Sequence, residues 1–190
     1  KAGKGSPPFF QRTHTQFIEI PSLGAVHYSE AMAHVERLWR ESGRRPLPAL
    51  DSAVEEQART FLRKSGFGPR DWYVTLHVRE GGFYQEAITG AASTSGHRSC
   101  DVKTYGLAVE RILDAGGWVV RMGNAKMSRV EWRHPRFIDY AHCDENCEEL
   151  DIALLQSSRF HFGTNSGPMT VAASFARPMG ISNFVPLTNT

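Results

Sequence analysis

The feature that most restricts the fold of this chain is an alternation of short apolar runs with helical segments, which begins at residue 72. The runs are rich in β-branched and aromatic residues and are separated by turns or helical patterns. They cover residues 72–78, 118–122, 136–140, 159–163 and 180–184. A repeated order of strand and helix is typical of a parallel sheet with helices on both faces. We therefore predict a Rossmann-like α/β domain over residues 71–190.

The segments between these runs carry the helical signals. Apolar residues three and four positions apart predict a helix over residues 105–113, and a second helix over about 168–176 ends before Pro178. A short apolar segment at 150–155 leads into the fourth run. The predicted helices would supply the layers that cover the sheet.

Residues 1–70 have a different pattern, and we predict that they form an arm outside the sheet domain. A lead-in rich in Gly and Pro is followed by two short apolar runs that predict a hairpin. A helix then begins near Ser29, and another begins at Ser52, which has the capping-box spacing to Glu55. This second helix ends at Gly66.

Composition restricts the partners of the chain. Its 190 residues carry a formal net charge of only +2, so no strong electrostatic field favours a nucleic-acid partner. The longest apolar stretches hold about seven residues, against roughly 20 needed for a transmembrane helix. We therefore expect a cytoplasmic protein with no transmembrane segment and no nucleic-acid partner. The chain begins without Met, and we expect it to be a piece of a longer protein.

The three cysteines are an odd number, which favours reduced thiols over a disulfide framework. His142, Cys143 and Cys147 lie close together, and His134 is near them in the sequence. A zinc site is disfavoured, because zinc ligands usually come as two closely spaced pairs and the second pair is missing here. We therefore predict no metal site and no cofactor.

Polar residues and glycines collect at the ends of the predicted strands. In parallel sheets a ligand binds outside the carboxyl ends of the strands, where loops lead into helices. The segments at these ends are 77–82, 121–124, 139–142 and 163–167. A ligand site at this one edge of the sheet is therefore predicted.

The segment GTNSGP after the fourth run is suited to phosphate. Its glycines let backbone amides approach a ligand, Thr164 and Ser166 supply hydroxyls, and Asn165 lies between them. The helix that begins near Gly167 and Pro168 carries a partial positive charge at its amino end. The alternative is an ordinary helix cap by Ser166, and the loop sequence alone favours neither.

Two side chains at the end of the first run point to the same side. Alternation along TLHVRE places His77 and Arg79 on one face and Glu80 on the other. A guanidinium at a strand end is suited to bidentate contact with phosphate oxygens, and it can stabilise charge on a leaving phosphate. The alternatives are a salt bridge from Arg79 to a carboxylate, and a neutral His77 that is hydrogen-bonded within the core.

Several common reaction classes lack their motifs. The chain has no Walker A sequence, no G-x-G-x-x-G after a strand and no G-x-S-x-G elbow. Classical nucleotide hydrolysis, dinucleotide redox chemistry and serine-hydrolase chemistry are therefore disfavoured. The class of function that remains is the binding of a phosphate-bearing donor molecule by a site without a P-loop.

Four segments in the order TLHVRE, GGWVVRMG, FIDYAH and LDIALLQSSRFHFGTNSGP resemble a family of bacterial glycosyltransferases, over about residues 16–186. More distantly, the two edge motifs are similar to those of fucosyltransferases with an H-x-R motif, which include the α-1,6-, nodulation and protein O-fucosyltransferases. The resemblance implies a GT-B-like enzyme, in which two Rossmann-like halves enclose a nucleotide sugar. This chain would be the carboxyl-terminal, donor-binding half, and its amino-terminal lobe would be missing.

The resemblance also implies roles for individual residues. Arg79 matches the arginine that contacts the donor diphosphate, and His77 matches the motif histidine. Asp151 matches the aspartate that reads the guanine base, and Ser166 matches the first serine of a T-x-S-S loop. The second serine is replaced by Gly167, so backbone amides would take over part of the phosphate contact.

Candidates for the catalytic base and for further substrate contacts are fewer. The acidic residue proposed as base in the α-1,6 enzymes has no counterpart, and Glu86, one residue away from its position, is the remaining candidate. Arg121 and Gly123, at the end of the second run, are candidates for substrate contact. Arg121 is also placed to pair with Asp139 instead.

The mechanism that the resemblance implies is direct displacement at the anomeric carbon by a hydroxyl of a glycan or protein acceptor. No D-x-D triplet for a metal ion is present. Arg79 and the loop at 164–167 would instead neutralise the leaving phosphate.

Two other functions fit the same residues. The chain would bind a nucleotide sugar or a carbohydrate without catalysis, or it would be a sugar-nucleotide epimerase built on the same two-lobed plan. The absence of a clear base favours the binding module slightly, and fold alone decides neither. The sequence leaves the sugar, the nucleotide base and the acceptor open.

Overall fold

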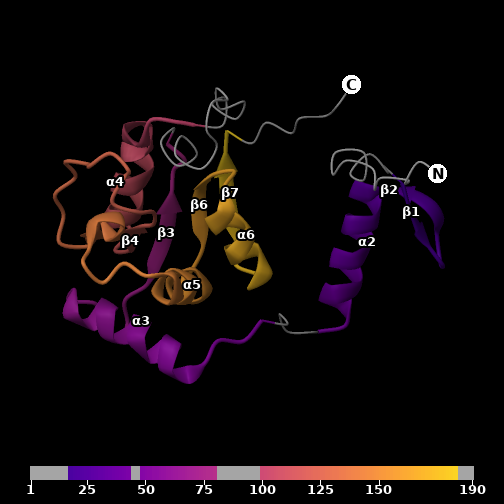
Figure 1. The fold of residues 1–190 in the computed structure, drawn as a ribbon, viewed down its shortest axis with the longest axis horizontal. Coiled ribbons are helices and arrows are strands. Elements are labelled where there is room, and N and C mark those ends of the chain that lie inside the picture. Colours follow the sequence, from indigo (N-terminus) through magenta and orange to yellow (C-terminus); the bar gives the residue numbers. More distant parts are fainter. Residues whose placement is uncertain (1–16, 44–47, 81–98, 184–190) are drawn as a thin grey trace, which may run out of the picture. The chain divides into compact units, whose positions relative to one another are not determined.

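The larger part of the chain is built on a sheet of five parallel strands (Figure 1). The computed structural model describes residues 17–43, 48–80 and 99–183. The strands lie in the order β5-β4-β3-β6-β7, and each neighbouring pair is parallel. They are β3 (Tyr73–His77), β4 (Trp118–Arg121), β5 (Phe137–Ile138), β6 (His161–Thr164) and β7 (Met179–Ser182). Each overlaps one of the five predicted runs, so the predicted parallel sheet is confirmed.

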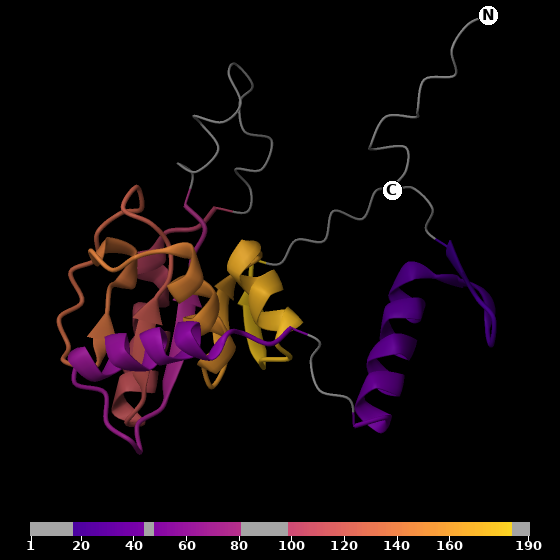
Figure 2. The ribbon, with the colours of Figure 1, turned by 60° about the horizontal axis from the view of Figure 1, so that its bottom comes forward.

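Helices cover both faces of this sheet, as predicted. The side chains of β3 alternate between the faces because the strand is pleated. Val74 and Leu76 share one buried cluster with the inner side of α4 (Gly106–Asp114), which follows the short 3-10 turn η2 (Val102–Tyr105). Tyr73 packs in the cluster that covers the opposite face. The helices of that face are α3 (Ser52–Lys64), α5 (Glu148–Ser157) and α6 (Gly167–Ser174), with α3 beside α5 (Figure 2).

The segment 150–155, predicted only as a short apolar connection, is the middle of helix α5. Acidic residues in the first turn, among them Glu148 and Asp151, are favourable at the amino end of a helix. Leu150 and Leu154 recur at helical spacing and are buried in the core. The helix therefore extends beyond the apolar segment at both ends.

The order of the strands creates a crevice at the carboxyl ends of β3 and β6. The chain passes from β3 outward to β4 and β5, and it then returns to the other side of β3 to form β6 and β7. Ligands of such sheets bind at this reversal of strand order. The ends of β3 and β6, which carry most of the predicted site residues, therefore meet at the expected place.

The structure divides into two compact units, Lys1–Arg45 and Pro46–Thr190. The smaller unit holds a hairpin of β1 (Phe17–Ile20) and β2 (Gly24–His27), followed by the helix α2 (Tyr28–Glu41). The hairpin and this helix agree with the sequence prediction. Within the described part of the chain, no helix combines the length and the apolar content that a membrane span requires.

Helix α3, which the sequence analysis places in the arm, belongs to the larger unit. Phe61 and Leu62 are buried in the same cluster as the inner residues of α5 and of the sheet. The boundary between the units therefore falls at residue 45 rather than near residue 70. The amino cap of α3 also differs from the prediction, because Asp51, and not Ser52, accepts a hydrogen bond from the Ala53 N–H at 2.8 Å.

His161 on β6 is a fully buried histidine. Its Nδ1 lies 3.0 Å from Oγ1 of Thr75 on β3, and its Nε2 has no hydrogen-bond partner. Burial disfavours the charged imidazolium and lowers the pKa of His161 to about 4. The ring is therefore neutral in the folded protein at neutral pH.

We expect His161 to make the folded protein sensitive to acid. Its folded pKa of about 4 lies below the value of about 6.5 in an unfolded chain, so the unfolded chain takes up the proton first. The stability that the neutral ring contributes is complete above pH 6.5 and is lost as the pH falls toward 4, by up to about 3 kcal/mol.

Urea unfolding of the wild type and of His161→Asn, at pH 7 and at pH 4.5, measures this loss. The variant should lose less free energy of unfolding than the wild type between the two pH values. His27→Asn, which removes an exposed histidine from β2, is the control and should keep the pH dependence of the wild type. Equal losses in wild type and His161→Asn would contradict the prediction.

Candidate functional site

A cavity of about 600 Å³ opens at the carboxyl ends of β3, β4 and β6. Residues that follow these strands form its wall together with the first turns of α5 and α6. The predicted site residues in its lining are His77, Arg79, Gly123, Asp151, Ser166 and Gly167. Residues that are far apart in the sequence thus surround one space, as the rule for parallel sheets predicts.

Arg79 is fixed to the end of β6 through its backbone. Its N–H donates a 2.8 Å hydrogen bond to Oγ1 of Thr164. Thr164 is fully buried and is not part of the cavity lining. The hydroxyl of Thr164 therefore holds the exit of β3 in place, and the half-buried side chain of Arg79 lines the cavity.

His77 and Ser166 form a hydrogen-bonded pair between β3 and the start of α6. The hydroxyl of Ser166 donates to the carbonyl oxygen of Thr164 at 3.1 Å, and Nδ1 of His77 lies 2.8 Å from the same hydroxyl oxygen. Because a hydroxyl has one hydrogen, the two bonds form together only when Nδ1 carries a hydrogen and donates it. The neutral ring then has no hydrogen on Nε2.

The electrostatic surroundings of His77 agree with a neutral ring. Burial is the main reason why the pKa of His77 is lowered to about 4, and the nearby His161, Arg121 and Arg79 act in the same direction. His77 is therefore uncharged at neutral pH although it lines the cavity. Positive charge at this edge of the cavity comes from Arg79.

Ser166 occupies the amino-cap position of α6, but its side chain makes no hydrogen bond to the helix amides. It bonds to His77 instead, so the alternative of an ordinary Ser166 cap is wrong. Gly167 begins the helix, and the space where its Cβ would lie is open. The first-turn amides, at the positive end of the helix dipole, therefore lie at the wall of the cavity without a side-chain cap from Ser166.

Asp151 lines the cavity from the first turn of α5. Its Oδ1 is shielded from solvent and has no hydrogen-bond partner. Burial raises the pKa of Asp151 to about 6; a hydrogen bond with Tyr140 opposes this rise, and the charge of Glu148 adds to it. Leaving a buried acceptor unpaired costs free energy. A ligand with N–H or O–H groups would supply the missing donor.

Arg121 and Asn165, like Thr164, lie outside the cavity lining. Arg121 is 1% exposed, and its guanidinium donates to Asp139 at 2.9 Å and to Glu80 at 3.0 Å. The alternative that Arg121 pairs with Asp139 is therefore confirmed. Asn165 lies in the loop between β6 and α6, beside the lining rather than in it.

Glu80 is a residue that sequence reasoning placed on the wrong side. Alternation put it on the face opposite Arg79, but it lines the same cavity. The strand ends at His77, so the alternation of faces no longer applies at residue 80. Its carboxylate bonds to Arg121 and accepts the N–H of Ser128 at 2.7 Å. The sequence signal that could have indicated a site role for Glu80 is its position directly after Arg79, the arginine predicted to bind phosphate.

Glu86, the candidate base, lies outside the described residues, as do the glycines at 81 and 82.

In the described ranges, no three His, Cys, Asp or Glu side chains are grouped so that they would hold a metal ion. The residues considered for zinc have other partners: His142 bonds to Asp139, and the thiol of Cys143 lies 3.6 Å from a backbone oxygen.

Comparison with known proteins gives a distant structural likeness. No family model matches the chain, and no curated protein matches it. Among solved structures, the crystal structure of a glycosyl transferase family 9 protein from Veillonella parvula is similar, with a TM-score of 0.48 and 14% sequence identity. The match covers 70% of this chain and 35% of that chain. This chain thus spans about a third of the length of that protein.

We expect glycine to be required at position 123, in the wall that follows β4. The φ of Gly123 is +140°, which side chains disfavour, and an added Cβ would collide with the sulfur of Met127. Gly123→Ala should therefore lower the free energy of unfolding by about 2 kcal/mol or more.

Gly167→Ala is the matched control, because nothing lies within 4 Å of the position of its Cβ. It should change the free energy of unfolding by less than about 0.5 kcal/mol. Urea unfolding of both variants at neutral pH measures the difference. Equal effects of the two substitutions would show that Gly123 has no special steric role.

Proposed function

We propose that this chain is the donor-binding half of a glycosyltransferase, which transfers a sugar from a nucleoside diphosphate sugar to an acceptor hydroxyl without a metal ion. The observation that carries the proposal is the meeting of three kinds of group around one cavity. Arg79 offers a guanidinium, Gly167 marks the amino end of a helix, and Asp151 offers a carboxylate. The guanidinium and the helix amino end suit the negative charge of a diphosphate. The carboxylate suits a nucleotide base that has N–H groups.

In this proposal the diphosphate lies between Arg79 and the amino end of α6. The guanidinium supplies a permanent positive charge and parallel donors, and backbone amides supply further donors. Both stabilise the charge that develops on the leaving phosphate. His77 is neutral, so its Nε2 would accept a hydrogen bond from a ligand hydroxyl rather than bind phosphate oxygen. Glu86 stays the candidate for the base that takes the proton of the acceptor.

Asp151 would receive the nucleotide base. A carboxylate accepts two parallel N–H bonds, which suits guanine, the base implied by the resemblance to fucosyltransferases. The cavity volume of about 600 Å³ is within the range of about 300–1,000 Å³ that is common for small-ligand sites. Its position at the reversal of strand order is where sheets of this kind bind nucleotides.

We expect a nucleoside diphosphate to bind through Arg79. Calorimetric titration with GDP, UDP, ADP and CMP should show binding of at least one diphosphate. Arg79→Ala should weaken that binding by about a hundredfold, because a charge-assisted bond contributes up to about 3 kcal/mol. Arg111→Ala removes an exposed arginine from α4 and should bind like the wild type. Undiminished binding by Arg79→Ala would refute the proposed diphosphate site.

A turnover assay separates the transferase from the two alternative functions. A transferase should release free nucleoside diphosphate from the donor sugar and form a new glycosidic bond on a glycan or protein acceptor. A binding module would leave the donor intact, and an epimerase would return a nucleotide sugar that is altered at one carbon. Either of these outcomes would replace the transferase proposal.

We also expect nucleotide affinity to depend on the ionisation of Asp151. Because its pKa is raised to about 6, the carboxyl is ionised at pH 7.5 and mostly protonated at pH 5. Only the carboxylate accepts both N–H bonds of guanine, so GDP affinity should fall about tenfold between these pH values. Asp151→Asn should bind GDP weakly at both pH values. If both proteins lose affinity equally on acidification, Asp151 does not contact the base.

A further inference from the structure

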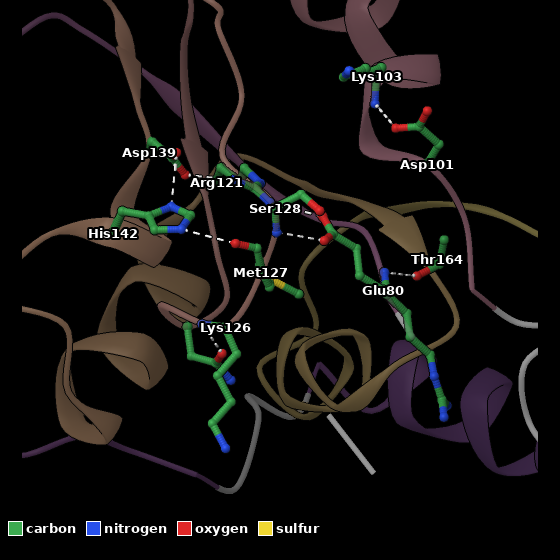
Figure 3. A network of polar contacts seen from close by, with 12 residues as sticks. Glu80, Asp101, Lys103, Arg121, Lys126, Met127, Ser128, Asp139, His142 and Thr164 are labelled. Carbon is green, nitrogen blue, oxygen red and sulfur yellow. Dashed lines mark hydrogen bonds and ion pairs between the residues drawn. The ribbon is translucent and has the colours of Figure 1, made fainter. Parts of the chain in front are cut away.

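The ends of β3, β4 and β5 are joined by a chain of partly buried ion pairs (Figure 3). Arg121, at the end of β4, donates to Oε1 of Glu80 on one side and to Oδ1 of Asp139 on the other. Its side chain is 1% exposed, and those of the two carboxylates are 16% and 23% exposed. A buried guanidinium is tolerated only when its charge is paired. The three side chains therefore form one electrostatic unit.

His142 extends this unit toward the loop that follows β4. Its Nδ1 lies 3.0 Å from Oδ2 of Asp139, and its Nε2 lies 3.0 Å from the carbonyl oxygen of Met127. The ring therefore bridges the end of β5 and the loop. We call these four residues the edge network: Glu80, Arg121, Asp139 and His142.

The edge network also anchors the loop that follows β4. Oε2 of Glu80 accepts the N–H of Ser128, and His142 donates to the carbonyl of Met127. Two successive residues of the loop, Met127 and Ser128, are thus held by side chains of the edge network. Met127 and Gly123, in the same stretch of chain, line the cavity.

We propose that the edge network positions the ligand site: it fixes the exit of β3, which carries Arg79, relative to the loop wall at residues 123–128. Glu80 is the chain neighbour of Arg79, so movement of Glu80 would displace the backbone that carries the guanidinium. A misplacement of this kind is costly in a site that depends on geometry. The identity of the ligand in this inference rests on the proposed function. The contacts that hold the loop do not depend on it.

The first test needs no ligand. Hydrogen exchange should show the Ser128 amide protected, because Glu80 accepts its hydrogen bond. An unprotected Ser128 amide would overturn the edge network.

The second test uses Glu80→Gln, which keeps the shape of the side chain and removes its charge. Exchange at Ser128 should become about tenfold faster, and inorganic pyrophosphate should bind about tenfold more weakly. Glu131→Gln removes an exposed carboxylate after the same loop, and it should change neither quantity.

The outcomes separate this inference from the proposed function. If the wild type binds neither pyrophosphate nor any nucleotide, the proposed function fails, and the Ser128 exchange still decides whether the network holds the loop. If the wild type binds and Glu80→Gln binds equally well, the positioning role is wrong and the proposed function stands. Unfolding temperatures of all variants confirm that they are folded.

Discussion

The candidate site depends on the close pairing of β3 with β6. In this pair His77 stands opposite Gly163, whose φ is +145°, and a Cβ at Gly163 would overlap the carbonyl group of His77. Glycine at this position lets the two backbones approach. The N–H of Arg79 then reaches Thr164, and the ring of His77 reaches Ser166. The pairing of β3 with β6 thus sets the relative positions of the site residues.

The sheet could be predicted from the sequence because its strands are buried on both faces. All residues of β3 are buried, and such strands are continuous apolar runs between polar turns. Helix α3 was assigned to the arm because an amphipathic pattern shows that one face is buried but not what covers it. Helix α5 was missed for a different reason, since a short apolar run at 150–155 does not distinguish helix from strand.

The candidate site could be predicted only where it follows from strand ends. His77, Arg79 and Ser166 come at or just after strands, and the carboxyl-end rule is sufficient to bring them together. The bond of Arg121 to Glu80 could not be predicted, because it depends on how the chain leaves the sheet, where alternation of faces no longer applies. Asp151 was suggested by resemblance, and its unpaired buried oxygen is visible only in the folded chain.

The wall of the cavity is shared between elements of different origin, and this has an evolutionary consequence. Arg79 follows the end of β3 and is held through its backbone to Thr164, whereas Asp151 stands on the first turn of α5. Under the proposed function, substitutions at exposed positions of that turn would change the preferred nucleotide base without moving the guanidinium. One pocket would thus combine a contact fixed by strand pairing with a contact that a single helical turn can vary.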